Sequence, residues 1–158
     1  MRVLAVCGAG AAVAAAVAVL GGGGAAVAGD RAEADLAYHG VAVMSGGRMD
    51  LRFTPRNHGP EAVPDATVRL RWSEPLEDRQ VLPDGCAREA ERVVVCRVGA
   101  LGADSVGERV ELRVRLLGVP SEVLLEIDTV WDGGTVDLNR ANDRQRVLVL
   151  DSGDEYYF

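Results

Sequence analysis

Apolar and polar residues alternate one by one along several stretches of this chain, which is the pattern of β-strands that bury one face. Met49, Leu51 and Phe53 are separated by Asp50 and Arg52, and the same alternation occupies segments 66–72, 110–116 and 123–131. Less regular candidates lie at 36–43, 93–98 and 146–150. Because no segment shows a convincing helical period, the pattern predicts about seven strands and no helical domain.

Strands with one apolar and one charged face belong to antiparallel sheets that are solvated on one side. Two such sheets must pack together, because neither buries its apolar face alone. The sequence therefore predicts an all-β fold, an Ig-like antiparallel sandwich of about seven strands. The predicted core contains the apolar-phase residues Phe53, Leu70, Trp72, Leu112, Val114, Leu125 and Ile127. Trp131 follows the same phase, so core packing is favoured over sugar stacking for both tryptophans.

The first 28 residues have the order of a secretory signal peptide. Arg2 is followed by the apolar run Val3–Leu20, by Gly21–Gly24, and by a small-residue box that ends Ala26-Val27-Ala28. Cleavage is expected before Gly29. An uncleaved membrane anchor is the alternative, since the uncharged stretch is long enough to span a bilayer.

Export fixes the expected domain organisation and redox compartment. The prediction is a signal peptide at 1–28, a short linker at 29–33, the sandwich at 34–150 and an acidic, aromatic tail at 151–158 without an obvious partner strand. Cys7 leaves with the signal, and Cys86 and Cys96 remain. An even pair in an oxidising compartment favours a disulfide, with free thiols or a metal site as alternatives.

The formal net charge of −7 argues against nucleic acid as a partner. All 17 basic residues are arginines, and they alternate with acids along the predicted strands, as in segment 109–115. This alternation indicates a solvated, salt-bridged sheet face.

Several motifs, taken in order, resemble a bacterial surface-repeat family called domain of unknown function 11. They are Ala34-Asp35-Leu36, the turn Asn57-His58-Gly59-Pro60, the cysteine pair, Leu101 with the strand 110–116, and the segment 137–143 with Asn139 and Asn142. Asp143 stands where the family has a second asparagine. The resemblance covers about residues 34–150 and implies secretion, an Ig-like sandwich and a role in surface architecture or adhesion, without an activity.

The motif residues have a physical role in turns. The side chain of Asn57 is expected to cap its turn, Gly59 to tolerate a positive φ, and Pro60 to fix the exit. Asn139 and Asn142 are expected to act in the same way before the last strand.

Motifs of catalysis are absent from the sequence: there is no nucleophile elbow, P-loop, dinucleotide motif or zinc-protease motif. His39 and His58 have no recognisable partner. We therefore expect no enzymatic activity, no cofactor and no metal. The expected function is a secreted or cell-surface module for envelope architecture, adhesion or protein contact, with an unknown extracellular protein or glycan as partner, and no membrane contact unless the signal is retained.

The alternative is a carbohydrate- or calcium-dependent binding module. Asp128, Asp132, Asp137 and Asp143 flank a predicted hairpin and its exit and supply the oxygen ligands that calcium takes. Turn formation and solvation are the favoured roles of these residues. If the domain binds a partner through loops, the segment 132–134 and the tail after Leu150 are the candidates.

Overall fold

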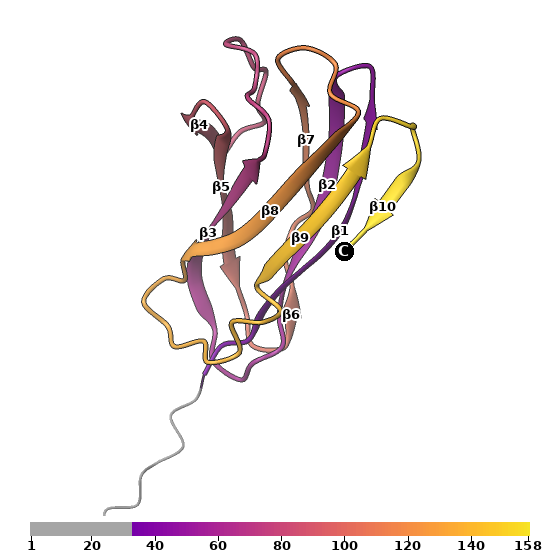
Figure 1. The fold of residues 1–158 in the computed structure, drawn as a ribbon. Helices are drawn as coiled ribbons and strands as arrows, with labels where there is room; N and C mark the ends of the chain where they lie inside the picture. The colour runs from indigo at the N-terminus through magenta and orange to yellow at the C-terminus, as the bar shows by residue number, and fades with distance from the viewer. Residues whose placement is uncertain (1–32) are drawn as a thin grey trace, which may run out of the picture. The chain divides into compact units, whose positions relative to one another are not determined.

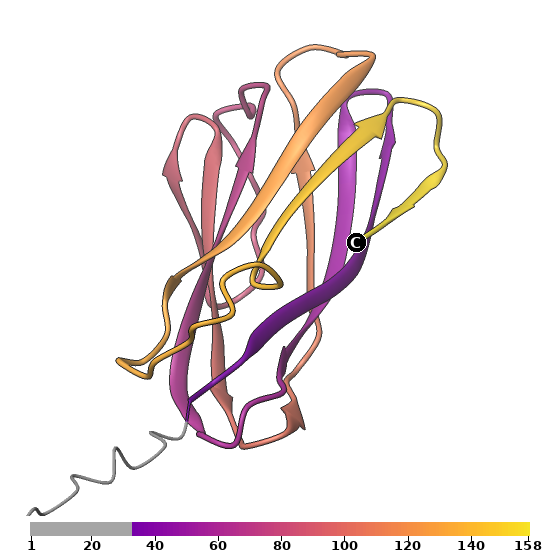
Figure 2. The same cartoon turned by 60° about the horizontal axis from the view of Figure 1, so that its bottom comes forward.

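The computed structural model of the protein describes residues 33–158. The predicted signal peptide, its cleavage site and most of the linker lie outside these residues. The described chain is all-β, with strands and no helix. Its ten strands form two antiparallel sheets that pack face to face (Figures 1 and 2). The predicted all-β fold with two packed sheets is confirmed.

The first sheet has β2 (Arg48–Asn57) at its centre, between β1 (Leu36–Ser45) on one side and both β6 (Ser105–Val106) and β7 (Val110–Arg115) on the other. The short strand β10 (Glu155–Tyr157) pairs with the outer edge of β1. The second sheet runs in the order β4 (Cys86–Ala90), β5 (Val93–Leu101), β3 (Val63–Trp72), β8 (Glu122–Trp131) and β9 (Arg144–Leu150).

A tight hairpin joins β1 to β2 and fixes their register. Gly46 and Gly47 form its turn with φ of 58° and 71°. Positive φ at both turn residues is the backbone that matches the twist of the flanking strands, and glycine adopts it without strain. All ten residues of β1 pair in register with β2 as a result.

The apolar faces of the two sheets form one continuous core. All seven residues that the alternation predicted to be buried are at most 5% exposed. Trp72 is among the largest buried side chains, and its indole Nε1 donates to the Met49 sulfur at 3.2 Å. Tyr38 and Phe53 pack edge to face with ring centroids 6.0 Å apart. The strand phase read from the sequence is therefore correct for these residues.

The outer faces of both sheets carry cross-strand ion pairs, as the alternation of arginines and acids predicts. Arg113 pairs with Asp50 on the first sheet. On the second sheet Arg69 pairs with Asp128 at 2.6 Å, and Arg146 pairs with Glu126 at 3.2 Å.

The chain end forms the strand β10, although the sequence showed no partner strand for residues 151–158. Tyr157, Tyr156 and Glu155 pair with residues 41–43 of β1, and Phe158 exchanges backbone hydrogen bonds with Gly40. Tyr156 and Phe158 pack against the core. The first sheet therefore extends to the last residues of the described chain.

Cys86 and Cys96 form a disulfide, which confirms the predicted pairing. The two residues lie directly opposite each other on β4 and β5, with their Cα atoms 4.0 Å apart. The bond attaches the edge strand β4 to the second sheet. In the described part of the chain, no helix exists that is long and apolar enough to cross a membrane.

Candidate functional site

Asn57 is a fully buried residue that holds the turn after β2 through its side chain. Its Oδ1 accepts hydrogen bonds from the backbone N–H groups of Asp35 at 3.1 Å and Gly59 at 3.0 Å. Its Nδ2 donates to the carbonyls of Glu61 at 2.7 Å and Gly102 at 3.0 Å. These four bonds use both acceptor positions of the amide oxygen and both N–H groups of the amide nitrogen. Asn57 therefore joins three segments of the main chain and has no free hydrogen-bonding group for a ligand.

Gly59 is required for space and not for an unusual backbone. The sequence predicts that Gly59 is needed for a positive φ, and this prediction is wrong because its φ is not in the positive range. A Cβ at this position would lie 2.3 Å from the carbonyl oxygen of Glu33 and 2.7 Å from the Cα of Ala34. The following Pro60 is exposed at the turn exit. The turn therefore packs directly against the segment that leads into β1.

The loop between β8 and β9 attaches to the beginning of β1 through carboxylates. Asp137 accepts from the Leu36 N–H at 2.9 Å with one oxygen and from the Asn139 N–H at 2.9 Å with the other. Asn139 and Asn142 both donate through Nδ2 to Oδ1 of Asp35, at 3.1 and 2.7 Å. These contacts place the two asparagines in a clamp on Asp35.

A buried polar group lies beneath this loop. The hydroxyls of Tyr38 and Thr129 are 2.6 Å apart, and the Arg140 guanidinium donates to the Thr129 carbonyl at 3.1 Å. Arg140 Nε lies 3.2 Å from Oδ2 of Asp143, a side chain with no exposed surface. Burial raises the pKa of Asp143, partly opposed by Arg140 and reinforced by Asp137. Burial also raises the pKa of Tyr38.

The four aspartates of the calcium alternative do not converge. Asp128 pairs with Arg69 on the outer sheet face, whereas Asp137 is occupied by backbone N–H groups and Asp143 by Arg140. Asp132 accepts from the Gly134 N–H within its own turn at 3.1 Å. Within residues 33–158 no cluster of three or more His, Cys, Asp or Glu side chains is arranged to hold a metal ion.

Trp131 lies on the outside of the second sheet, so the prediction that it packs in the core is wrong. The cause is an irregularity in the pairing of β3 with β8: Thr67 pairs with Trp131, but Val68 pairs with Thr129. The extra residue, Val130, reverses the phase of the strand beyond it. The Trp131 side chain consequently shares the outer face with Thr67, and the residue is 53% exposed.

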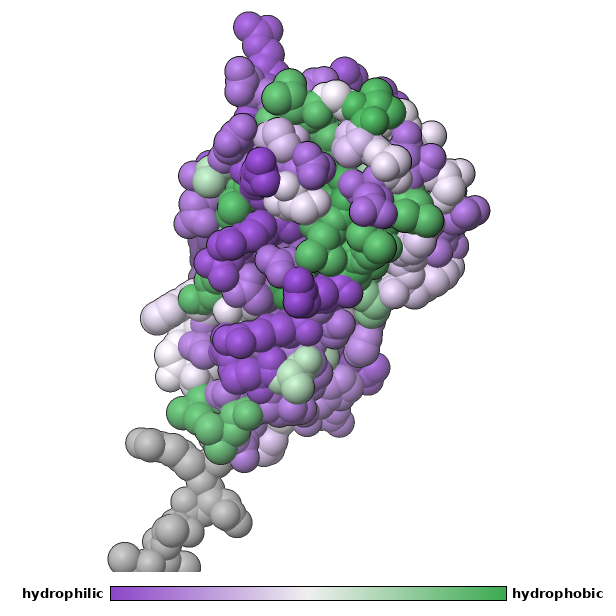
Figure 3. All heavy atoms as spheres, viewed as in Figure 1, coloured by the Kyte–Doolittle hydropathy of each residue, from purple (hydrophilic) through white to green (hydrophobic). Residues whose placement is uncertain are grey.

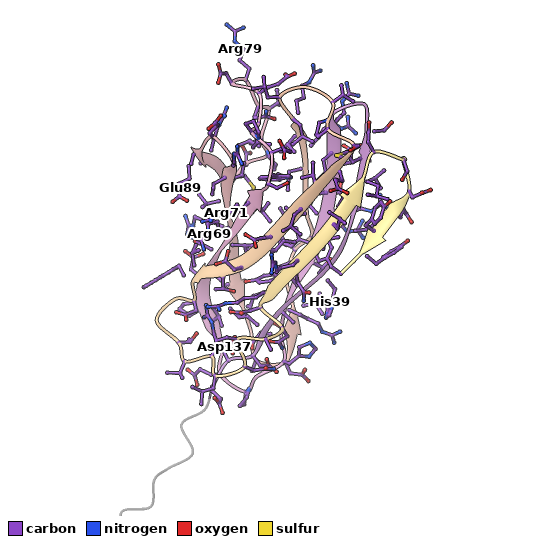
Figure 4. All side chains as sticks on the ribbon, in the orientation of Figure 1. His39, Arg69, Arg71, Arg79, Glu89 and Asp137 are labelled. Carbon is purple, nitrogen blue, oxygen red and sulfur yellow. A yellow bond between two sulfur atoms is a disulfide. The ribbon has the colours of Figure 1, made fainter. Side chains whose placement is uncertain are left out.

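The register of the second sheet gathers arginines on the same outer face. One row across the strands contains Arg97, Thr67 and Trp131. The rows beside it follow from the same pairings and contain, in order, Arg69 with Asp128 and Arg144, and Arg71 with Glu126 and Arg146. Figure 4 shows Arg69 and Arg71 projecting from β3. An open hollow of about 320 Å³ is lined by the arginines and acids of β3, β8 and β9.

The outer face of β8 and β9 changes character along the strands. Beyond the charged rows, Leu124 pairs with Leu148, and Leu150 follows on β9. Leu148 is 52% exposed and Leu150 is 42% exposed. Figure 3 shows this division, with a hydrophobic area above a hydrophilic one over these strands.

The remaining sequence candidates lie apart from one another. His39 is exposed on the outer face of the first sheet, opposite Thr54. His58 is exposed in the turn after β2, beside a hollow of about 430 Å³ that Pro60 and Asn139 also line. The sequence did not indicate that the arginines on the outer face of the second sheet lie near one another, because their proximity depends on the sheet order β5-β3-β8-β9.

The fold and the polar clamps define an all-β sandwich whose distinctive polar residues hold loops in place. A scan of protein-family models, a search of curated proteins and a search of solved structures each found no match to this chain. The resemblance to domain of unknown function 11 stays a prediction from the motifs.

Proposed function

We propose that this protein is an exported, non-catalytic module with an Ig-like sandwich, which serves in envelope architecture, adhesion or contact with another extracellular molecule. The observation that carries the proposal is the disulfide between Cys86 and Cys96. Such bonds persist in oxidising compartments outside the cytosol. The signal pattern of residues 1–28 supports the same compartment.

The use of the polar residues supports the non-catalytic part of the proposal. Asn57 and Asp137 bind backbone N–H groups, and Asn139 and Asn142 bind Asp35. His39 is exposed on the outer face of the first sheet and His58 is exposed in the turn after β2. The asparagine and aspartate side chains keep the shape of the loops, and a rigid scaffold with shaped loops is suited to binding.

Glycan binding is the second candidate, and the exposure of Trp131 favours it. An indole that is 53% exposed on the outer sheet face offers an apolar surface to a sugar ring, and Arg97 stands in the same row across the sheet. Calcium dependence receives no comparable support from the described residues.

Expression of the whole gene with its own N-terminus tests the proposal. The exported protein is expected to begin at Gly29, to contain no free thiol, and to sediment with isolated cell envelopes of its own species. N-terminal sequencing, thiol titration and co-sedimentation measure these three properties. An intracellular protein that retains Met1 and two free thiols at Cys86 and Cys96, or an exported protein that leaves envelopes unbound, would contradict it.

A further inference from the structure

We propose that the outer face of the second sheet binds an anionic polysaccharide, with Trp131 stacking on a sugar ring and neighbouring arginines binding its acidic groups. This inference rests on the glycan-binding candidate above and specifies its ligand and residues. We call the surface the arginine–tryptophan face. It comprises Trp131 and five arginines, namely Arg69, Arg71, Arg97, Arg144 and Arg146.

The local charge of this face is opposite to that of the whole chain. The hollow over β3, β8 and β9 is lined by four arginines and two carboxylates, Glu126 and Asp128, which leaves a local charge of +2. The chain as a whole has a formal charge of −7. A positive area on an acidic protein attracts an anionic ligand locally, while the rest of the surface repels it and orients the approach.

Three of the five arginines pair with carboxylates, and two of these, Arg69 and Arg97, are each held by two hydrogen bonds. Arg69 donates from Nε and Nη2 to the two oxygens of Asp128, at 3.1 and 2.6 Å. Arg97 donates from the same two atoms to Oδ2 of Asp65, at 3.2 and 2.9 Å. A guanidinium held by two bonds still has N–H groups on its other edge, so a ligand carboxylate meets a donor whose orientation is already fixed.

Arg71 and Arg144 supply the charge that is not neutralised. Both are exposed, and neither forms an ion pair with a side chain among residues 33–158. Each stands in a row beside a carboxylate that already pairs with another arginine. Their guanidinium groups are therefore available to acidic groups of a ligand.

Trp131 provides the contact that a purely electrostatic site lacks. It lies about 10 Å along β8 from the row of Asp128, given a rise of about 3.3 Å per residue. Across the sheet, Arg97 and Arg144 are separated by three strand spacings, or about 14 Å. A ligand that spans these distances is an extended chain with rings and charges at intervals, which describes an acidic polysaccharide.

Other anionic partners fit the face less well. Nucleic acid carries a charge on every phosphate and requires a dense basic surface, whereas here every second position in the charged rows is acidic or neutral. A protein partner typically requires a large contact with an apolar centre. The apolar area of this sheet, at Leu124, Leu148 and Leu150, lies beyond the charged rows and on the side away from Trp131.

Affinity measurements with two forms of one polymer test the proposal. The probes are an oligogalacturonate, whose sugars carry carboxylates, and the same oligomer fully methyl-esterified, which removes the charge. The exported protein is expected to bind the acidic oligomer, more weakly as salt rises. Trp131→Ala is expected to weaken binding by about tenfold, as loss of a central aromatic contact does. Arg71→Ala/Arg144→Ala is expected to weaken binding of the acidic oligomer and to flatten its salt dependence.

Matched controls come from the outer face of the first sheet. Tyr157→Ala removes an aromatic side chain of a residue that is 72% exposed, and Arg113→Ala removes an exposed arginine. Both are expected to leave the affinity unchanged.

Equal binding of the acidic and esterified oligomers would overturn the role of the arginines. Stronger binding of single-stranded DNA, or an affinity that Trp131→Ala leaves intact, would overturn the polysaccharide assignment.

Envelope binding separates failure of this inference from failure of the proposed function. If the Trp131 and arginine variants sediment with envelopes as well as the unaltered protein does, the arginine–tryptophan face is wrong and the module still binds. If the unaltered protein itself does not sediment, the proposed function has failed. Circular dichroism of each variant confirms that it is folded before either comparison.

Discussion

Asp143 is a buried carboxyl group whose ionisation the fold opposes. Its side chain has no exposed surface, and burial is the largest cause that raises its pKa above the ordinary 3.8. The folded state therefore holds a proton at pH values where the unfolded chain has released it. Since the native state binds more protons in this range, the contribution of Asp143 to stability falls as pH rises through the raised pKa.

Asp143→Asn is expected to remove this contribution, because an amide does not ionise. The difference in free energy of unfolding between the wild type and the variant should move in favour of the wild type as pH is lowered through the raised pKa. It should become constant below 3.8, where the carboxyl is protonated in both states. Urea unfolding of both proteins over a pH series measures the difference. A difference that stays the same at every pH would contradict the raised pKa.

Leu112 and Arg113 are neighbours on β7 with opposite environments, which makes them a matched pair. Leu112 is 5% exposed in the core, so Leu112→Ala is expected to reduce stability by about 2–5 kcal/mol. Arg113 is exposed on the outer face, and Arg113→Ala is expected to change stability little. Chemical denaturation measures both. Equal losses would mean that the phase of β7 is wrong.

The disulfide between β4 and β5 acts at the scale of an element, because it holds an edge strand that has one neighbour in the sheet. Arg88 on β4 gives independent support. Its guanidinium donates to the carbonyls of Leu76 and Glu77, at 3.0 and 2.7 Å. The strand is therefore attached both by the covalent bond and by hydrogen bonds.

Cys86→Ala/Cys96→Ala is expected to remain folded and to lose about 2–3 kcal/mol, since the closed loop is short. The sequence separation of the cysteines is 10 residues. Urea unfolding of this variant and of the reduced wild type should give similar losses. Failure of the reduced wild type to fold would show that the hydrogen bonds of Arg88 do not hold β4.

The strand β10 contributes to the stability of the first sheet through its pairing with β1 and through two aromatic side chains. Deletion of residues 151–158 removes the contacts of Tyr156 and Phe158 with the core. We expect a loss of about 2–4 kcal/mol, given what burial of an aromatic side chain contributes. Thermal unfolding measures the loss, with Tyr157→Ala as the control because this residue is exposed. A truncated chain as stable as the full one would show that β10 contributes nothing to the stability of the fold.

Strands with clean alternation could be predicted, and strands that depend on their neighbours could not. Segments 110–116 and 66–72 show their buried faces in the sequence, and β7 and β3 occupy them. The three residues of β10 are too few to show a period, and the strand exists because β1 has a free edge. Trp131 was misplaced for a related reason, since the irregularity at Val130 arises in the pairing with β3.

At the scale of the whole molecule, the arrangement of charge could not be predicted from the chain. The sequence shows arginines and acids in alternation and a net charge of −7. Only the order β5-β3-β8-β9 brings Arg71 beside Glu126 and Arg146, which lie far along the chain from it. The bond of Asn57 to the Gly59 N–H is local and follows from the turn sequence, whereas the side chains of Asn139 and Asn142 bind Asp35, 104 and 107 residues away, which the chain alone does not indicate.

The two tryptophans provide the most direct test of the account, because the fold gives them opposite environments. Trp72 is buried, with its indole N–H directed at the Met49 sulfur, and Trp131 is 53% exposed on the proposed binding face. The measurement is a titration of the ¹⁵N-labelled exported protein with the acidic galacturonate oligomer, followed through the two indole N–H signals. The Trp131 signal is expected to shift progressively while the Trp72 signal stays in place. A Trp131 signal that does not move, or equal shifts of both signals, would contradict the account.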